Sequence, residues 1–372
     1  MKNNFPARIV IIGIAAATML FPQDAALQTS QNNDKLKKAF EQHPDADADG
    51  DGILTMKEAE AYRSTMKTKG TKGGKDAAQT PTNVPAATSD GEGNGTDDAA
   101  VLALFEAREF KGVKYRLLRP IDLPNNPDKK YPMLLSLHGA AGVGDDNVKN
   151  VREWGTIYGE EAWRRKHPCF VVVPQSPGMW QTPGTTTNLT KEVRAKLPKV
   201  WQDFLGGKES KRLENPELAN LDRVFLLLDA LAKEFPIDTD RVYVQGHSMG
   251  GFGTWTAVVE QPNRFAAAIA SAGWIGPWAD VAPIKDLPMW AFQGGKDKEI
   301  QVQLGNTTFE WMKQLGHNLK FTEVANMGHS VVHAALSYTG DSPGRVTKYA
   351  SDKCDKTADV WEWLFSKKRA AK

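Results

Sequence analysis

The sequence predicts an α/β fold with a mostly parallel central sheet, preceded by a small helical module. Between residues 101 and 368, apolar runs of strand length alternate with longer helical patterns, an order typical of a parallel sheet covered on both faces. A strand-like run leads directly into Gly-x-Ser-x-Gly at 246–250, and a helical pattern follows. An acidic loop near the start of the chain indicates the separate helical module.

The first 26 residues have the pattern of a secretory signal peptide. Lys2 and Arg8 precede a charge-free apolar run at 9–20, which is too short to span a bilayer, and small residues follow it. An uncleaved N-terminal anchor is the alternative interpretation. We therefore expect a secreted or periplasmic protein without stable membrane insertion after signal cleavage.

Residues 33–66 contain a loop that matches an EF-hand calcium loop at each position. Alternating carboxylates, a sharp turn at Gly52 and a closing glutamate provide the oxygen ligands that Ca²⁺ prefers. The expected metal ligands are Asp47, Asp49, Asp51, the carbonyl of Ile53, and Glu58. An acidic disordered tail is the alternative. Because EF-hands usually work in pairs and this loop is single, we expect modest calcium affinity and a structural or adhesive role.

Residues 67–98 are rich in Gly, Thr, Lys, Ala, Pro and Asp and contain almost no large apolar side chains. Such a segment cannot bury enough surface to fold, so we expect a disordered linker. A flexible chain of this length spans about 30 Å between its ends. The EF-hand-like module is therefore expected to be tethered near a catalytic domain at 101–368.

The catalytic domain is expected to contain seven strands and four long helices. The expected strands are 114–118, 133–137, 170–173, 241–244, 266–270, 289–292 and 320–324. The expected helices are 218–235, 251–260, 304–315 and 358–365. The nearly apolar run at 224–231 suits a helix that packs against the central strands.

Ser248 is the expected nucleophile. It lies in Gly-His-Ser-Met-Gly, where a strained strand-to-helix turn leaves almost no room for side chains two positions on either side. Gly246 and Gly250 meet that requirement. The turn also places the serine at the start of a helix, where the helix dipole favours developing negative charge.

In this type of fold the acid and the histidine follow the serine in that order. His329 comes just after the expected strand 320–324 and is the expected general base, with His333 in reserve. Asp297, in the loop after strand 289–292, is the expected acid, and Glu299 is the alternative. His317 follows Leu-Gly in a helix-to-strand turn and is expected on the surface.

Backbone N–H groups and tryptophans complete the expected site. The N–H of Met249 and that of Ala140, with Ala141 as second choice, are expected to form the oxyanion hole. His138 is expected to brace the loop that carries Ala140. The expected substrate contacts are Trp180 and Trp274, on loops after strands, with Trp278 nearby; packing in the core is the alternative for all three.

The charge pattern bears on nucleic-acid binding, and the two cysteines bear on disulfide formation. Formal net charge is +2 at pH 7, and basic and acidic residues are interspersed, so we expect no nucleic-acid partner. Cys169 opens an apolar run and is best explained as a small buried residue. Export would also allow a disulfide with Cys354, which the spacing alone does not decide.

The motifs together resemble a known family. His138-Gly139, residues 246–255, the Gly-Gly-Lys-Asp loop at 294–297, Gly328-His329 and residues 360–365 resemble a bacterial branch of the α/β hydrolases, termed predicted peptidases and carboxylesterases. This branch is akin to polyhydroxybutyrate depolymerases, feruloyl esterases and acetyl-xylan esterases. The resemblance covers about residues 110–365, whereas 179–221 and 330–356 are longer than its pattern. It implies ester cleavage through an acyl-enzyme with no catalytic cofactor.

The expected function is hydrolysis of a small-molecule or polysaccharide ester, such as an acyl or feruloyl ester, by a Ser-His-Asp triad. A serine peptidase of the same fold is one alternative. A calcium-dependent binding protein with an inactive hydrolase domain is the other, and the complete set of Ser248, His329 and Asp297 argues against it.

Overall fold

The structure is a computed structural model that describes 30, 34–43, 46–47, 53–54, 59, 62, 95–126, 128–152, 154–180, 190–206 and 220–369. The chain divides into two compact units, Met1–Pro81 and Thr82–Lys372. The expected signal peptide at 1–26 and most of the expected linker at 67–98 lie outside the described residues. No helix within the described ranges is long and apolar enough to cross a membrane.

In the first unit, the described residues form a small apolar cluster around α1 (Asp34–Gln42). Its buried members are Leu36, Ala46, Leu54 and Ala59. Ser30 N–H donates to the Leu54 carbonyl at 2.8 Å, and Leu54 N–H donates to Ser30 Oγ at 2.9 Å. The apolar cluster joins the helix to Leu54 of the acidic loop, and the hydrogen bonds join Ser30 to the same residue.

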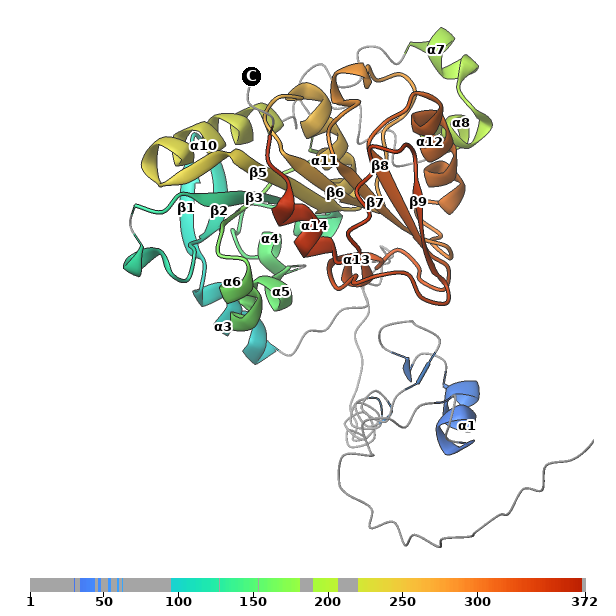
Figure 1. Cartoon of the computed structure of the whole chain (residues 1–372), viewed down its shortest axis with the longest axis horizontal. Helices are drawn as coiled ribbons and strands as arrows, with labels where there is room; N and C mark the ends of the chain where they lie inside the picture. Colours follow the sequence, from blue (N-terminus) through green and yellow to red (C-terminus); the bar gives the residue numbers. More distant parts are fainter. Residues whose placement is uncertain are drawn as a thin grey trace, which may run out of the picture. The chain divides into compact units, whose positions relative to one another are not determined.

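The second unit is built on one nine-stranded mixed sheet (Figure 1) with the order β1-β2-β4-β3-β5-β6-β7-β8-β9. The strands are β1 Glu106–Phe110, β2 Val113–Leu118, β3 Tyr131–Leu137, β4 Phe170–Pro174, β5 Ile237–His247, β6 Ala267–Ser271, β7 Met289–Gly294, β8 Leu319–Val324 and β9 Arg345–Tyr349. The six neighbouring strands β4, β3, β5, β6, β7 and β8 run parallel to one another. The strands β1, β2 and β9 pair antiparallel at the two edges.

Helices cover both faces of this sheet. Their bounds are α3 Gly95–Ala103, α4 Lys149–Arg152, α5 Gly155–Gly159, α6 Glu161–Lys166, α7 Lys191–Lys196, α8 Lys199–Gly206, α10 Leu221–Glu234, α11 Met249–Glu260, α12 Val302–Gln314, α13 Val332–Leu336 and α14 Val360–Ser366. One core cluster contains buried residues of α8, α10, α11 and α12, and the other contains residues of α4, α5, α6, α13 and α14 (Figure 1). Along β3, Met133 and Leu135 belong to the first cluster and Leu134 to the second, as the two-residue period of a strand requires.

All seven expected strands and all four expected helices are present, with ends shifted by a few residues. The edge strands β1 and β9 were not expected. Their sequences, EAREF and RVTKY, contain charged residues and lack the continuous apolar runs of the buried parallel strands. The strand β9 and helix α13 account for the long separation between His329 and the last helix.

The expectation that His317 lies on the surface is wrong, because its residue is only 3% exposed. Ser351 Oγ donates to the His317 carbonyl, so the segment after β9 covers this turn.

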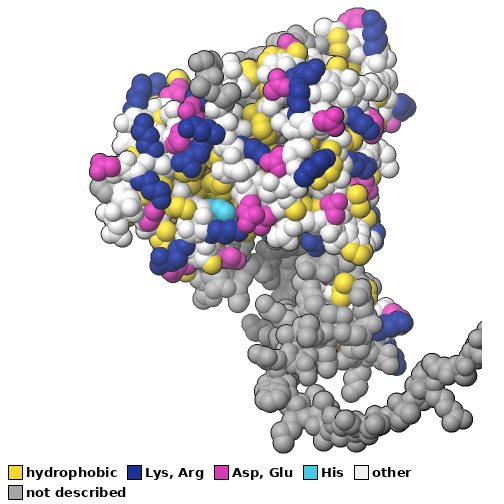
Figure 2. Space-filling model, viewed as in Figure 1, with side chains coloured by type: hydrophobic (Ala, Val, Ile, Leu, Met, Phe, Trp, Pro, Cys, Tyr) yellow, Lys and Arg dark blue, Asp and Glu magenta, His cyan; other side chains and the backbone are white. Residues whose placement is uncertain are grey.

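Cys169 and Cys354 are both free and buried. On the face of the second unit visible in Figure 2, basic and acidic side chains are interspersed and form no single stripe. The absence of a nucleic-acid partner stays a prediction.

His167 links the end of α6 to α14. Its ring stacks on Phe365 with 4.8 Å between ring centroids, and the Trp163 ring lies 5.7 Å away. Burial lowers the pKa of His167 to about 4, and the neighbouring charge of Lys166 acts in the same direction. The ring is therefore neutral at pH 7.

Acid is expected to destabilise the fold through this ring. The unfolded chain protonates His167 near pH 6.5 and the folded chain only near pH 4, so its stabilising contribution is complete above pH 6.5 and is lost as pH falls towards 4. In His167→Phe, the loss of unfolding free energy between pH 7 and pH 4 is expected to be smaller by about 1–2 kcal/mol, allowing for solvent screening. Urea titrations at both pH values measure this, with exposed His333→Gln as control. An equal acid loss in wild type and His167→Phe would contradict the assignment.

Candidate active site

Ser248 lies at a sharp turn between β5 and α11. Its backbone has φ 53° and ψ −118°, a conformation that L-residues rarely adopt. Ser248 N–H donates to the Ser271 carbonyl at 2.8 Å, and Phe252 N–H donates to the Ser248 carbonyl at 3.0 Å. The turn is thus held from β6 and from the first turn of α11, and it keeps the strained backbone in place.

The glycines on either side of Ser248 are needed for close packing. A Cβ at Gly246 would overlap the backbone of Gly250, and a Cβ at Gly250 would overlap the carbonyl oxygen of Leu137. No residue with a side chain fits either position without moving backbone. The second contact also places the turn directly against the carboxyl end of β3.

Ser248, Asp297 and His329 meet at the carboxyl edge of the parallel strands. They follow β5, β7 and β8, whose ends share one edge of the sheet. Ser248 Oγ lies 2.8 Å from His329 Nε2, and His329 Nδ1 lies 2.9 Å from Asp297 Oδ2. Since a carboxylate only accepts, Nδ1 carries the donated proton and the Nε2 lone pair faces the serine hydroxyl. This arrangement can draw a proton from Ser248.

Asp297 is an ionised acid in the interior, and its side chain is 0% exposed. Burial raises the pKa of its carboxyl, but hydrogen bonds from His329 and from the N–H groups of Ile300 and Glu299 outweigh burial and hold the pKa below its usual range. The negative charge is therefore present at neutral pH, where it can stabilise a protonated His329.

The alternative residues occupy different positions. Glu299 Oε2 lies 3.5 Å from His329 Nε2, with its side chain 70% exposed, so this carboxylate is near the serine side of the ring. His333 is exposed on α13, whereas His329 contacts both Ser248 and Asp297. The structure thus brings together the first-choice residues and leaves the reserves outside the hydrogen-bonded chain.

The loop after β3 is tightly braced. His138 is buried, and its Nε2 accepts the Ser176 N–H at 3.0 Å, so its Nδ1 donates to the Gly139 carbonyl at 2.7 Å. Trp180 Nε1 donates to the His138 carbonyl at 2.9 Å. Ala140 follows in a short 3-10 turn, Ala140–Gly142, and is exposed. His138 and Trp180 therefore fix the backbone that presents Ala140.

The expectation that Trp180 and Trp274 contact substrate is wrong, because each residue is only 2% exposed. Trp180 packs against Gly253 and His138, where its indole supports the loop after β3. Trp274 packs edge-on to Phe321 inside the core. Both indole N–H groups find buried acceptors, which explains why these rings are inside and not on a cleft rim. Trp278 is partly buried against Trp201.

Two polar residues around the triad were not anticipated. His247 Nε2 donates to the His329 carbonyl at 2.6 Å, which ties the base's backbone to the turn that carries Ser248. Gln293 Nε2 donates to Asp297 Oδ2 at 2.8 Å. The sequence carries a signal for Gln293, which is the amide near the end of the otherwise apolar strand β7. A buried amide needs hydrogen-bond partners, so a partner near Asp297 could have been expected.

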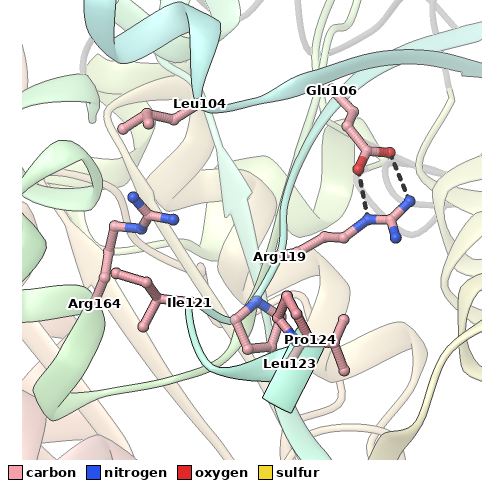
Figure 3. A pocket seen from close by; sticks show the side chains of 8 residues that line it. Leu104, Glu106, Arg119, Ile121, Leu123, Pro124 and Arg164 are labelled. Atoms are coloured by element: carbon pink, nitrogen blue, oxygen red, sulfur yellow. Dashed lines mark hydrogen bonds and ion pairs between the residues drawn. The ribbon is translucent and has the colours of Figure 1, made fainter. Parts of the chain in front are cut away.

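A separate pocket of about 360 Å³ lies at the start of β1 and the end of β2 (Figure 3). Ile121 and Leu123 contribute apolar walls, and the Arg119–Glu106 ion pair closes one side. Because β2 runs antiparallel to β4, its end lies at the sheet edge opposite the one that carries Ser248. This pocket is therefore not part of the Ser248 site.

The expected calcium loop is only partly within the described residues. Asp47 and Ile53 are described, whereas Asp49, Asp51 and Glu58 lie outside. Among the described residues, no group of three or more His, Cys, Asp or Glu side chains could hold a metal ion. The pairing of Leu54 with Ser30 satisfies the backbone at the loop position that normally pairs with a second EF-hand loop.

Comparison with known proteins shows which families and structures this chain is similar to. The prolyl oligopeptidase family matches residues 219–279, which contain α10, β5, Ser248 and α11. Acyl-protein thioesterase 1 of Neurospora crassa is 24% identical over 239 residues, 61% of this chain and 91% of the relative. A bifunctional acetylxylan esterase/xylanase of Neocallimastix patriciarum is 29% identical over 150 residues, 40% of this chain and 17% of the relative. The solved structure of a thermostable esterase has 29% identity and a TM-score of 0.52, covering 72% of this chain and 64% of that one.

The chain thus spans less than two thirds of the solved esterase and a small part of the bifunctional relative. The mixed nine-stranded sheet with helices on both faces, together with the esterase structure, corresponds to the α/β-hydrolase fold. The similarity of this chain to esterases and a thioesterase supports the conclusion that it is a hydrolase acting on esters.

Proposed function

We propose that this protein is an exported serine hydrolase that cleaves carboxylic esters through an acyl-enzyme. Ser248 is the nucleophile, His329 the general base and Asp297 the acid that orients and stabilises the base. The observation that carries the proposal is the hydrogen-bonded chain from Ser248 Oγ to His329 at 2.8 Å and from His329 to Asp297 at 2.9 Å.

The reaction follows from this geometry. His329 Nε2 takes the Ser248 proton as Oγ attacks the ester carbonyl, and Asp297 stabilises the resulting imidazolium. His329 then gives the proton to the departing alcohol, which leaves an acyl group on Oγ. Water, activated by the same histidine, attacks the acyl group and releases the acid, returning the proton to Ser248.

The backbone N–H groups of Met249 and Ala140 are proposed to hold the oxyanion. Met249 is the first residue of α11, and the first N–H groups of a helix have no partner within the helix. The close contact of Gly250 with the Leu137 carbonyl supports the proposal, because it puts the turn beside the loop that carries Ala140. The same helix start favours negative charge.

The proposed substrates are small-molecule or polysaccharide esters, with acyl or feruloyl groups the leading class. Support comes from the acetylxylan esterase/xylanase relative and from the acyl-protein thioesterase relative. The test is a panel of p-nitrophenyl acetate, p-nitrophenyl butyrate, methyl ferulate and acetylated xylan. Turnover of one or more esters is expected, and turnover of none would overturn the proposal.

A serine peptidase is the second candidate, since the prolyl oligopeptidase family matches the segment around Ser248. A chromogenic dipeptide in the same panel separates the two activities, because a peptidase cleaves its amide bond and a dedicated esterase does not. A calcium-dependent binding protein with an inactive hydrolase domain predicts neither turnover nor reaction of Ser248 with a fluorophosphonate.

We also propose that Asp47, Asp49, Asp51, Ile53 and Glu58 bind Ca²⁺ in the first unit, outside the cell or in the periplasm. The alternating acids of the sequence support this proposal, and the hydrogen bonds between Ser30 and Leu54 order the described part of the loop. Millimolar Ca²⁺ is expected to bind the full-length protein and Asp49→Ala is expected to abolish binding, measured by calorimetry. Heat that is unchanged by Asp49→Ala would count against the loop.

A further inference from the structure

A buried amide contacts the same carboxylate oxygen that faces His329. Gln293, near the end of β7, is 0% exposed. Its Nε2 donates to Asp297 Oδ2 at 2.8 Å and to the Ile300 carbonyl at 2.8 Å. Its Oε1 accepts the Trp274 Nε1–H at 2.7 Å. The amide thus connects the core of the sheet to the acid.

The three contacts allow only one orientation of the amide. An indole N–H donates and never accepts, so the oxygen of Gln293 must face Trp274. The Nε2 group then faces two acceptors, the carboxylate of Asp297 and the carbonyl of Ile300. Trp274 therefore determines that a donor, not an acceptor, faces the acid.

All acceptor positions of Asp297 are used. Oδ1 accepts the N–H groups of Glu299 and Ile300, both at 2.9 Å. Oδ2 accepts from His329 Nδ1 and Gln293 Nε2. A carboxylate offers about four acceptor sites, and this side chain is fully buried. Water cannot replace a lost partner, so removing one donor frees the carboxylate to rotate or leaves it poorly neutralised.

We propose that Gln293, oriented by Trp274, is a positioning residue that holds Asp297 Oδ2 in line with His329 Nδ1. The inference rests on the proposed function, because it assigns a role within the same site. Trp274 then acts on the reaction through Gln293 and Asp297, from the interior of the core and without touching substrate.

Gln293→Met tests this role, because methionine has a similar length and no hydrogen-bonding amide. We expect kcat to fall about ten- to hundredfold, the range for a lost hydrogen bond to a charged group, with KM changed less than about twofold. The matched control is Gln245→Met on β5, since Gln245 is also buried and donates to the Tyr158 hydroxyl at 2.9 Å, away from the triad. An equal kcat loss in both variants, or none in Gln293→Met, would overturn the role.

Gln293→Glu separates positioning from packing, because glutamate has almost the same shape. Above the pKa of the introduced acid, two carboxylates face each other beside His329 and Glu299, and kcat is expected to fall as pH rises. Below it, the protonated acid can donate to Asp297 and activity is expected to return. A kcat–pH profile parallel to that of the wild type would overturn the role.

Trp274→Phe keeps an aromatic side chain and removes the donor, so kcat is expected to fall about three- to tenfold, as for a neutral hydrogen bond. The control is Trp290→Phe on β7, whose Nε1 donates to Thr322 Oγ1 at 2.9 Å, with no link to Asp297. The low-field proton resonance of His329 Nδ1–H reports the same geometry without turnover. It should shift in the Gln293 and Trp274 variants and stay unchanged in the Gln245 and Trp290 controls. If Ser248→Ala abolishes ester turnover while these variants keep wild-type kcat and resonance, only the positioning role fails. If the wild type turns over no ester, the proposed function fails, and the resonance still decides the positioning role.

Discussion

Replacing Ser248 with alanine is expected to lower kcat for every ester in the panel by about 10⁵- to 10⁶-fold. Without Oγ there is no atom to form the acyl-enzyme, and the remaining rate comes only from binding and the oxyanion donors. The folded state should be kept, because alanine tolerates the turn about as well as serine and the side chain loses only the Oγ contact to His329 within the described ranges.

The Ser248→Ala measurement needs two readouts and a matched variant. Turnover and labelling by a fluorophosphonate should both disappear, while the melting temperature stays within a few degrees. Ser337→Ala is the control, since Ser337 is exposed and its hydroxyl donates to the His333 carbonyl, away from the site. Turnover or labelling that survives in Ser248→Ala would show that another residue is the nucleophile.

Asp297→Asn is expected to lower kcat by about 10³- to 10⁴-fold, the loss known when the triad histidine takes the wrong tautomer. Oδ1 receives two backbone N–H groups, so the asparagine oxygen must stay there and its NH₂ must replace Oδ2. His329 Nδ1 then faces a donor and must give up its proton. The proton moves to Nε2, and the ring can no longer accept from Ser248.

Glu299→Gln is the control for this prediction, because Glu299 is the other acid near His329. Its kcat is expected to fall by less than about tenfold, since an exposed carboxylate contributes little. Steady-state kinetics and the rate of fluorophosphonate labelling measure both variants. If Glu299→Gln loses more than Asp297→Asn, the acid of the triad has been misassigned.

The buried parallel strands could be predicted because they are short apolar runs separated by helical patterns. A strand such as 170–173, with Phe-Val-Val-Val, is typical of a sheet covered on both faces. The edge strands β1 and β9 could not, since their charged sequences lack a continuous apolar run and also fit loops. The strand β1 pairs with β2 across the tight turn at 111–112, whereas β9 pairs with β8 across the longer segment 325–344.

The candidate triad could likewise be placed from local patterns. Each of Ser248, Asp297 and His329 follows a predicted parallel strand, and the carboxyl ends of such strands share one edge. The tryptophans could not be placed in this way, because a loop position does not reveal the direction of a side chain. Trp180 and Trp274 follow strands at the catalytic edge but turn their rings inward, where buried acceptors are available.

The sequence by itself determined the order of seven strands and the four long helices along the chain, the turn at Ser248 with its two glycines, and the candidate acid and base. These depend on steric limits and hydrophobic periodicity, which act over a few residues. Only the tertiary structure decided that Gln293 and His247 brace the triad, that both tryptophans are interior, and that Glu299 faces the serine side of His329. Those facts depend on hydrogen bonds between residues up to 82 positions apart, as between His247 and His329, and no local pattern encodes which distant donor meets which acceptor.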